Sequence, residues 1–279
     1  MTQRKTRIGI VAPGRALDQS IAARVTAVAG NSAELVFHPQ CFLSHGHFAG
    51  PDGARADAFA KFANDPSLDA IWFARGGYGA CRLLDLAFER LGEAARAKTY
   101  LGYSDTGFLL AQLAKRGIGR VAHGPMPADI LREGGEAAVR RAIGFLTGAD
   151  SEAGVEPSTR APGKYAAFNI SVLASLTGTV HAPDLAGHTL LIEDVGEYHY
   201  RLDRLIFILT NSETVRSVVG IRLGRCGPIP VNDVDFGMTE AEIAAYWCQK
   251  NGIPYLGRAD IGHDAENKIV VFGDRRPSA

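Results

Sequence analysis

The stretch at residues 98–126 constrains the fold of this chain more than any other. Residues 100–103 form a short apolar and aromatic run, which is typical of a buried strand, and from Gly107 onward apolar residues recur at helical spacing. A sharp turn at Ser104-Asp105-Thr106 joins the two. A serine at such a turn holds its hydroxyl clear of the sheet edge, beside the N–H groups of the helix start. This is the geometry of a nucleophile elbow.

The local pattern leaves a second interpretation open. The usual elbow has two glycines around G-x-S-x-G, whereas here Gly102 and Gly107 frame a segment one residue longer. Ser104 and Asp105 could instead cap the following helix, because serine and aspartate are common capping residues. This stretch alone does not decide between the elbow and the helix cap.

Strands and helices alternate through the first half of the chain. Apolar runs predict strands at residues 8–14, 33–37 and 68–74, and helical spacing predicts helices at residues 17–29, 54–64, 83–89 and 133–145. This alternation predicts a parallel β/α, Rossmann-like domain that binds ligands at the carboxyl ends of its strands. The loop Arg75-Gly76-Gly77-Tyr78-Gly79 follows the third strand and can therefore converge with Ser104.

The glycine loop has alternatives of its own. Its glycines allow close approach of the backbone to a ligand, but a plain strand-to-helix turn has the same composition. A phosphate-binding loop is disfavoured because the Walker lysine is missing, and the G-x-G-x-x-G fingerprint of a dinucleotide site is incomplete after the first strand.

The second half predicts a smaller α/β domain. Strands are expected at residues 189–192 within the segment 185–193, at 218–223 and at 268–272. Helices are expected at residues 169–176, 201–210 and 239–250, the last opened by a Thr239–Glu242 capping box. The region 146–164 is rich in small and turn-forming residues, although part of it could form an edge strand. We therefore predict an N-terminal domain at 1–148, a linker at 149–165 and a C-terminal domain at 166–279.

Composition excludes several classes of function. The 279 residues carry 30 basic and 30 acidic side chains, so no charge excess favours nucleic acid or an anionic membrane as a partner. The N-terminal apolar run, residues 8–12, is too short for a signal peptide or a membrane span, which predicts a cytoplasmic protein. The four cysteines lack metal-site spacing, and we predict neither a metal nor another cofactor.

An activated serine needs a base, and the base needs an orienting acid. Eight histidines compete for the role of base. His123 lies one β/α unit after the elbow, and His263 follows a glycine shortly before the final strand. Glu193 ends an apolar strand, where a carboxylate can point into a crevice, although it could equally be a solvated residue that opens a loop.

Five segments together resemble the L,D-carboxypeptidase family of serine peptidases. This family includes muramoyl-tetrapeptide carboxypeptidases and microcin C self-immunity peptidases. The segments occur in the family's order and cover nearly the whole chain: IGIVAPG, ARGGYGACRLLDL, GYSDTG with HGPM, IEDVGEYHYRLDR, and the late Gly-His. GYSD together with EDVGE is much more specific than either motif alone.

The resemblance implies an active site in a cleft between the two domains, with Ser104, Glu193 and His263 as a catalytic triad. It also implies an oxyanion hole from the backbone N–H groups of Gly77 and Asp105. Among the residues beside the glycine loop, Arg75 is our candidate for binding a substrate carboxylate bidentately, together with Gly76 and Tyr78. A structural salt bridge is the alternative role for Arg75.

The implied reaction releases the terminal D-alanine from a murein tetrapeptide. The family context implies a muropeptide or other small peptide as substrate, recycling of cell-wall fragments, and a homodimer without a cofactor. The chain departs from the family at residues 166–168, which lack glycine, and in its short C-terminal end, so substrate choice stays open.

Two other functions stay open at this stage. One is a microcin C-type immunity peptidase that cleaves a peptidyl-nucleotide antibiotic, and the other is a non-catalytic muropeptide-binding protein. The first is disfavoured because such relatives are longer, and the second because all three triad residues are present.

Overall fold

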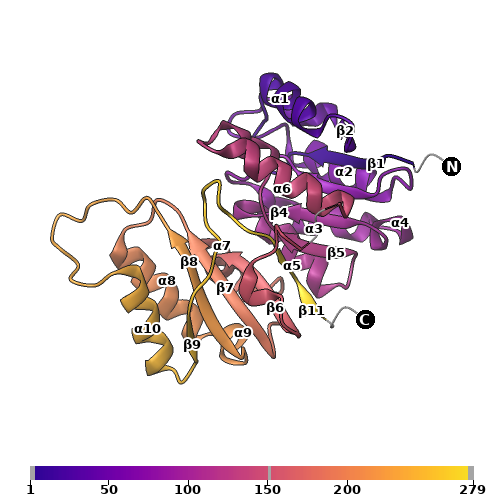
Figure 1. Cartoon of the computed structure of the whole chain (residues 1–279). Helices are drawn as coiled ribbons and strands as arrows, with labels where there is room; N and C mark the ends of the chain where they lie inside the picture. Colours follow the sequence, from indigo (N-terminus) through magenta and orange to yellow (C-terminus); the bar gives the residue numbers. More distant parts are fainter. Residues whose placement is uncertain (1–3, 150–151, 276–279) are drawn as a thin grey trace.

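The computed structural model describes residues 4–149 and 152–275, and it contains two β-sheets flanked by helices (Figure 1). The first sheet has the strand order β10-β5-β4-β3-β1-β2, and the second has the order β11-β6-β7-β8-β9. The predicted α/β class is confirmed. The predicted domain boundaries stay a prediction, and residues 1–3, 150–151 and 276–279 of that division lie outside the described residues.

The first sheet has a parallel body, as the alternating pattern predicts. Its parallel strands are β1 (Thr6–Val11), β2 (Ala33–Phe37), β3 (Ala70–Phe73), β4 (Thr99–Gly102) and β5 (Arg120–His123). The helices around it are α1 (Gln19–Ala29), α2 (Asp52–Asn64), α5 (Gly107–Lys115) and α6 (Gly135–Thr147). No strand is predicted at β5, which is a short run of four residues, RVAH.

One predicted helix of this half is wrong in extent. The helix expected at residues 83–89 is reduced to the single turn of α3 (Leu84–Ala87). Two 3₁₀ segments, η2 (Ala80–Leu83) and η3 (Phe88–Arg90), flank it, and the short α4 (Glu93–Arg96) follows. Further 3₁₀ segments are η1 (Pro39–Phe42), η4 (Ser104–Thr106), η5 (Pro127–Leu131) and η6 (Pro157–Thr159).

The second sheet has a parallel body of β6 (Gly163–Asn169), β7 (His188–Asp194), β8 (Gly220–Cys226) and β9 (Tyr255–Arg258). Its helices are α7 (Ile170–Leu176), α8 (His199–Asn211), α9 (Glu213–Arg216) and α10 (Glu240–Lys250). The capping box that opens α10 is confirmed, since the Glu242 carboxylate accepts from the Thr239 N–H at 2.8 Å. The strand β6 lies between two others and is therefore not an edge strand.

Residues 270–275 connect the two sheets. Of the single strand predicted at residues 268–272, only Val270–Val271 is a strand, and a second short strand that was not predicted begins at Gly273. The segment β10 (Val270–Val271) pairs antiparallel with β5 of the first sheet, and β11 (Gly273–Arg275) pairs antiparallel with β6 of the second. Residues just before this crossover, including His263, are therefore held at the junction of the sheets.

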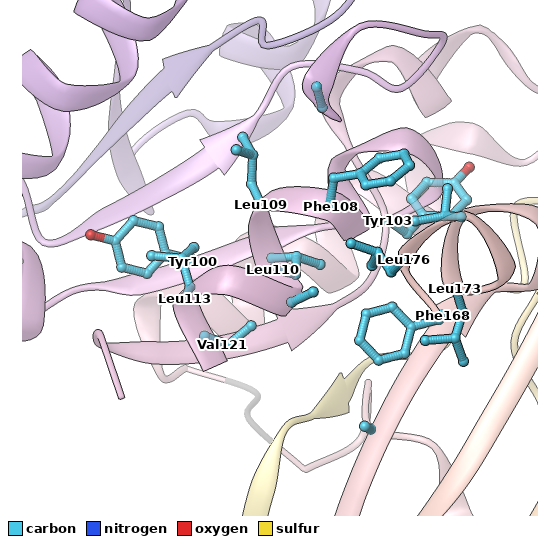
Figure 2. Packing of buried hydrophobic residues seen from close by; sticks show 14 of the residues in the cluster. Tyr100, Tyr103, Phe108, Leu109, Leu110, Leu113, Val121, Phe168, Leu173 and Leu176 are labelled. Carbon is cyan, nitrogen blue, oxygen red and sulfur yellow. The ribbon is translucent and has the colours of Figure 1, made fainter. Parts of the chain in front are cut away.

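Apolar packing also fixes the two sheets against each other. One continuous buried cluster includes Leu109 and Leu110 of α5 together with Phe168 of β6 and Leu173 of α7 (Figure 2). Each fully buried aliphatic or aromatic side chain contributes about 1.5–3 kcal/mol to folding. Because α5 begins directly after Ser104, this packing places the predicted nucleophile at the junction. In the described part of the chain, no helix combines the length and apolar character that crossing a bilayer requires.

Candidate active site

The turn that carries Ser104 is conformationally unusual. Ser104 has φ +59°, and it is the one non-glycine residue with positive φ in residues 4–149 and 152–275. This left-handed conformation costs an L-residue about 1–2 kcal/mol. Neither Ser104 nor Asp105 caps α5, whose N-cap is Thr106 without a side-chain hydrogen bond. The geometry is that of an elbow and does not support the helix-cap interpretation.

The glycine loop after β3 lies directly against this elbow. A Cβ atom built on Gly76 would be 2.7 Å from the Ser104 hydroxyl oxygen, so no larger residue fits without movement. Gly77 has φ +120°, which favours glycine. The Gly77 N–H has no hydrogen-bond partner within the described chain, and is thus available to a ligand.

Two buried charged side chains anchor the far end of the loop. The Asp105 carboxylate accepts from the Ala80 N–H at 2.9 Å, and the Arg55 guanidinium donates to the Gly79 carbonyl at 3.0 Å. Burial raises the pKa of Asp105. The sequence suggested the Asp105 backbone as an oxyanion donor and its side chain as a helix cap, but not a hydrogen bond to the glycine loop. Its side chain therefore has a structural function that sequence reasoning missed.

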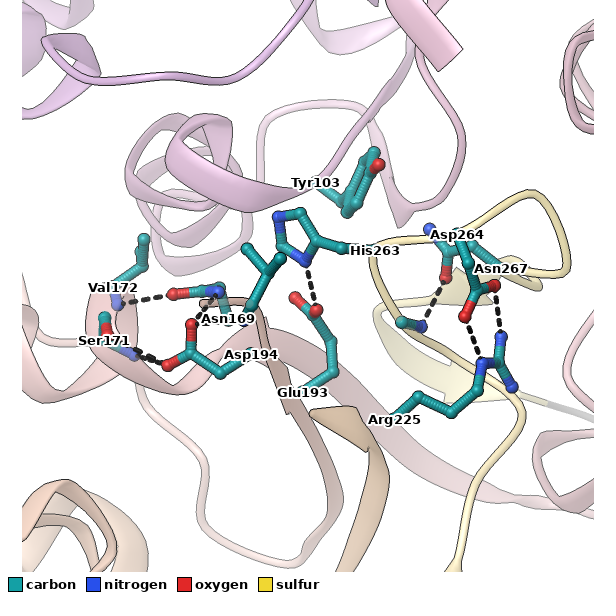
Figure 3. A network of polar contacts seen from close by, with 12 residues as sticks. Tyr103, Asn169, Ser171, Val172, Glu193, Asp194, Arg225, His263, Asp264 and Asn267 are labelled. Atoms are coloured by element: carbon teal, nitrogen blue, oxygen red, sulfur yellow. Dashed lines mark hydrogen bonds and ion pairs between the residues drawn. The ribbon is translucent and has the colours of Figure 1, made fainter. Parts of the chain in front are cut away.

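Glu193 and His263 form a buried pair at the end of β7. The Glu193 carboxylate is fully buried, and its Oε2 lies 2.5 Å from the His263 Nδ1. In Figure 3 the other ring nitrogen of His263 is on the side of the ring away from Glu193. This arrangement fixes the imidazole tautomer, because the carboxylate accepts a hydrogen bond from Nδ1–H and the other nitrogen is then the free base.

Electrostatics at this pair favour a charged carboxylate. Burial alone would raise the pKa of Glu193, but the His263 and His123 imidazoles outweigh it and lower that pKa to about 2. Burial lowers the pKa of His263, whereas the charge and hydrogen bond of Glu193 raise it, and the net result is a raised pKa. A base with this environment accepts a proton readily.

Ion pairs and one amide hold the loop that carries His263 (Figure 3). The Arg225 guanidinium donates to Asp260 at 2.6 Å and to Asp264 at 2.8 Å, one pair on each side of His263. The buried Asn267 side chain accepts from the Gly262 N–H at 3.2 Å. The sequence gives no local signal for Arg225, which lies on β8, far from this loop along the chain.

One cavity of about 310 Å³ brings several predicted residues together. Its wall comprises Arg75, Gly76, Gly77, Tyr103, Ser104, Met126, Ala128, Asp129, Leu131, Arg132 and His263. Glu193 lies buried behind His263. Two more predicted residues do not line this cavity either: Asp105 is buried beneath the elbow, and Tyr78 is 52% exposed beside His47 and Phe48.

Two arginines of the cavity wall differ in their pairing. Arg132 donates to Asp129 at 2.8 Å and so has a counter-ion. Arg75 makes no ion pair with any described residue, donates only to the Ala16 carbonyl at 3.3 Å, and has a buried Nε without a partner. Burial and the neighbouring Arg15 lower the pKa of Arg75. The salt-bridge alternative for Arg75 therefore has no partner in the described chain, and Arg132 is a cavity residue that sequence reasoning missed.

The cavity has no metal-ligand constellation. Within residues 4–149 and 152–275, no group of three or more His, Cys, Asp or Glu residues is arranged to hold a metal ion. The cysteines are free thiols, and Cys41, Cys226 and Cys248 are buried.

Comparison with known proteins identifies the class and then the family. Residues 8–124 match the LD-carboxypeptidase N-terminal domain, and residues 162–276 match the LD-carboxypeptidase C-terminal domain. A Streptomyces coelicolor protein assigned to the carboxypeptidases is 34% identical, and the match covers 92% of this chain and 91% of the relative. The chain of 279 residues is therefore a carboxypeptidase. The chain belongs to the LD-carboxypeptidase family, which confirms the resemblance seen in its motifs.

Further relatives agree with this assignment. The murein tetrapeptide carboxypeptidase of Pseudomonas aeruginosa is 29% identical over 96% of this chain and 91% of its own length. The crystal structure of the muramoyltetrapeptide carboxypeptidase from Oxalobacter formigenes superposes with a TM-score of 0.76 at 24% identity, covering 95% of this chain and 93% of that one. The microcin C7 self immunity protein in complex with aspartyl sulfamoyl adenosine reaches 0.76 at 20% identity, covering 99% and 98%. These two structures share the fold.

Proposed function

We propose that this carboxypeptidase hydrolyses the bond to the terminal D-alanine of a murein tetrapeptide, with Ser104 as nucleophile, His263 as base and Glu193 as orienting acid. The observation that carries the proposal is the buried Glu193–His263 pair, 2.5 Å apart, at the wall of the cavity that Ser104 also lines. The name of the Pseudomonas aeruginosa relative supports the choice of substrate.

The proposed mechanism follows from these positions. His263 takes the proton of Ser104 on the ring nitrogen that faces away from Glu193, and the Ser104 oxygen attacks the amide carbonyl. Glu193 holds the imidazole and stabilises its charged form. The Gly77 and Asp105 N–H groups donate to the oxyanion, and such donors contribute roughly 3–4 kcal/mol each. His263 then protonates the departing amine, and water releases the acyl group.

Substrate binding requires a group for the free α-carboxylate. We assign this role to Arg75, because a half-buried guanidinium without a counter-ion, on the wall of the same cavity, is suited to an anionic ligand. Gly76 allows the peptide to approach Ser104 closely. Tyr78 lies farther out and is proposed to contact a more distant part of the muropeptide.

The setting of the activity is also part of the proposal. We propose that the enzyme acts on murein fragments in the cytoplasm, as a homodimer, as the family context implies. Size-exclusion chromatography with light scattering measures the oligomeric state directly. A monomeric mass would contradict the homodimer without affecting the proposed reaction.

Release of free D-alanine from purified murein tetrapeptide tests the reaction. We expect release by the wild type, loss of at least about 10³-fold in kcat for Ser104→Ala, and unchanged activity for Ser175→Ala, which alters an exposed serine on α7. Release by Ser104→Ala at the wild-type rate would place the nucleophile elsewhere. No release by any of the three proteins would overturn the tetrapeptide reaction, and a peptidyl-nucleotide would then be the next substrate to test.

The proposed role of Arg75 has a separate test. We expect Arg75→Ala to raise KM for the tetrapeptide about 10- to 100-fold with a smaller change in kcat, because a charged hydrogen-bond pair with the substrate is lost. Arg140→Ala, which removes an exposed ion pair with Glu136, is the matched control. An unchanged KM for Arg75→Ala would refute carboxylate binding by this residue.

A further inference from the structure

The buried Glu193 carboxylate has two oxygens, and the Glu193–His263 pair uses only one of them. Its Oε1 is buried and makes no hydrogen bond with any described residue. An anionic oxygen in this position is costly, since burial removes its hydration. A donor for Oε1 is therefore expected nearby.

The His123 imidazole approaches Glu193 Oε1 from β5. It is 1% exposed, both of its ring nitrogens are buried without hydrogen bonds, and its Nε2 lies 3.9 Å from Glu193 Oε1. That separation exceeds a hydrogen bond by about 1 Å. Catalytic hydrogen bonds are commonly long in an enzyme without substrate and shorten when substrate binds.

The two side chains come from different sheets. His123 ends β5, where it pairs with Gly102 of β4, two residues before Ser104. Glu193 lies on β7 of the second sheet. A contact between them therefore connects the strand beside the nucleophile to the acid, across the junction of the two domains.

Tyr103 restrains both imidazoles. Its ring centroid lies 5.5 Å from that of His123 and 4.8 Å from that of His263. The Tyr103 hydroxyl donates to Asp129 at 2.7 Å, which fixes the ring. The titratable and charged groups around the Glu193–His263 pair are Tyr103, His123, Asp129, Arg132, Asp194 and the buried thiol Cys226.

We propose that His123 is a positioning residue for the catalytic pair, and that its Nε2–H donates to Glu193 Oε1. This inference rests on the proposed function of Ser104, Glu193 and His263. With both oxygens of Glu193 engaged, the carboxylate has one orientation, and His263 presents its free nitrogen toward Ser104. His123 takes no proton from the substrate and does not touch it.

The donor also sets the proton affinity of the pair. The Nε2–H of His123 places the positive end of its dipole beside Oε1 and stabilises the negative charge of Glu193. A carboxylate stabilised in this way raises the pKa of His263 less than a carboxylate without the donor. Removal of the donor therefore raises the apparent pKa at which His263 becomes a free base. A residue that serves only to fill space leaves that pKa unchanged.

Two substitutions of similar size separate these roles. Gln can place an N–H at the position of Nε2, whereas Met fills the space without a donor. We expect His123→Met to lower kcat about 10- to 100-fold, the loss that corresponds to one hydrogen bond to a charged group, with KM within about twofold. We expect His123→Gln to restore most of this loss. Equal impairment of both variants, or full activity of both, would overturn the inference.

A measurement without substrate tests the same inference independently. NMR titration of isotope-labelled histidines gives the pKa of His263, which we expect to be higher in His123→Met than in the wild type and close to the wild type in His123→Gln. An unchanged pKa in His123→Met would overturn the inference. Because this readout needs no substrate, it stays decisive even if the tetrapeptide is not cleaved, which would contradict the proposed function instead.

Discussion

The two halves of the molecule build the candidate site by different physical means. In the first half, backbone conformation places the groups: Ser104 has φ +59°, Gly77 has φ +120°, and Gly76 brings its backbone against the Ser104 hydroxyl. In the second half, burial and charge place them: the fully buried Glu193 fixes His263, and Arg225 pairs with residues on both sides of it.

This difference predicts how each half responds to substitution. A site set by backbone conformation is sensitive to added atoms and tolerant of a lost charge. A site set by buried charge has the opposite sensitivity, because an isosteric neutral side chain retains shape and loses the electrostatic effect. The following substitutions test this contrast, from the largest expected effect to the smallest.

Glu193→Gln retains the shape of the side chain and removes its charge. We expect kcat to fall about 10³- to 10⁴-fold, comparable to the loss when the acid of another serine triad is made an amide, while KM changes little. Asp105→Asn is the matched change in the first half, and we expect a loss below about tenfold because the amide oxygen can still accept from Ala80 N–H. Steady-state kinetics check both. Similar losses of kcat for the two variants would contradict the proposed difference between the two halves.

Gly76→Ala adds one methyl group to the first half. Its Cβ would meet the Ser104 hydroxyl oxygen at 2.7 Å, so the elbow or the loop must shift, and we expect a loss of about 10²-fold in kcat. Gly53→Ala on α2, where no atom lies within 4 Å, is the control. We expect it to leave kcat unchanged and to stabilise the protein by about 0.5–1 kcal/mol. Wild-type activity of Gly76→Ala would show that close packing at the elbow is unimportant.

Arg225→Met removes the ion pairs that hold the His263 loop. We expect kcat to fall about tenfold with KM nearly constant, because the base is less well oriented and the substrate contacts remain. The control is Arg258→Met, which breaks a pair with Glu240 away from the cavity. If the two variants lose activity equally, the Arg225 pairs do not orient His263.

The pH dependence of activity is the smallest expected effect. Because the net pKa of His263 is raised by Glu193, we expect the acid limb of kcat/KM to lie above the ordinary histidine value of 6.5. In Glu193→Gln that limb should move to lower pH, since the charge that raises the pKa is gone. A limb that stays in place would assign the titration to another group.

Folding stability has its own pH dependence. The lowered pKa of Glu193 stabilises the fold above pH 4.5, and this contribution is lost as pH falls toward about 2.

Sequence reasoning reached some site residues and not others for physical reasons. Ser104 could be predicted because a strand-to-helix turn is a local pattern. Glu193 could be predicted only in part, because a carboxylate at the end of an apolar strand has two interpretations. His263 was one of eight histidines, and the family resemblance alone separated it from His123. The donors that surround these residues, such as Arg225, have no local pattern at all.

The sequence by itself determined the α/β class, most helices and strands, the two sharp loops and the family, because these follow from local periodicity, glycine placement and motif order. Only the tertiary structure decided the change of sheet between β10 and β11, the packing of α5 against α7, and the approach of His123 to Glu193. These contacts join residues far apart along the chain. They depend on how apolar faces and buried charges fit together in space, and no local pattern encodes that fit.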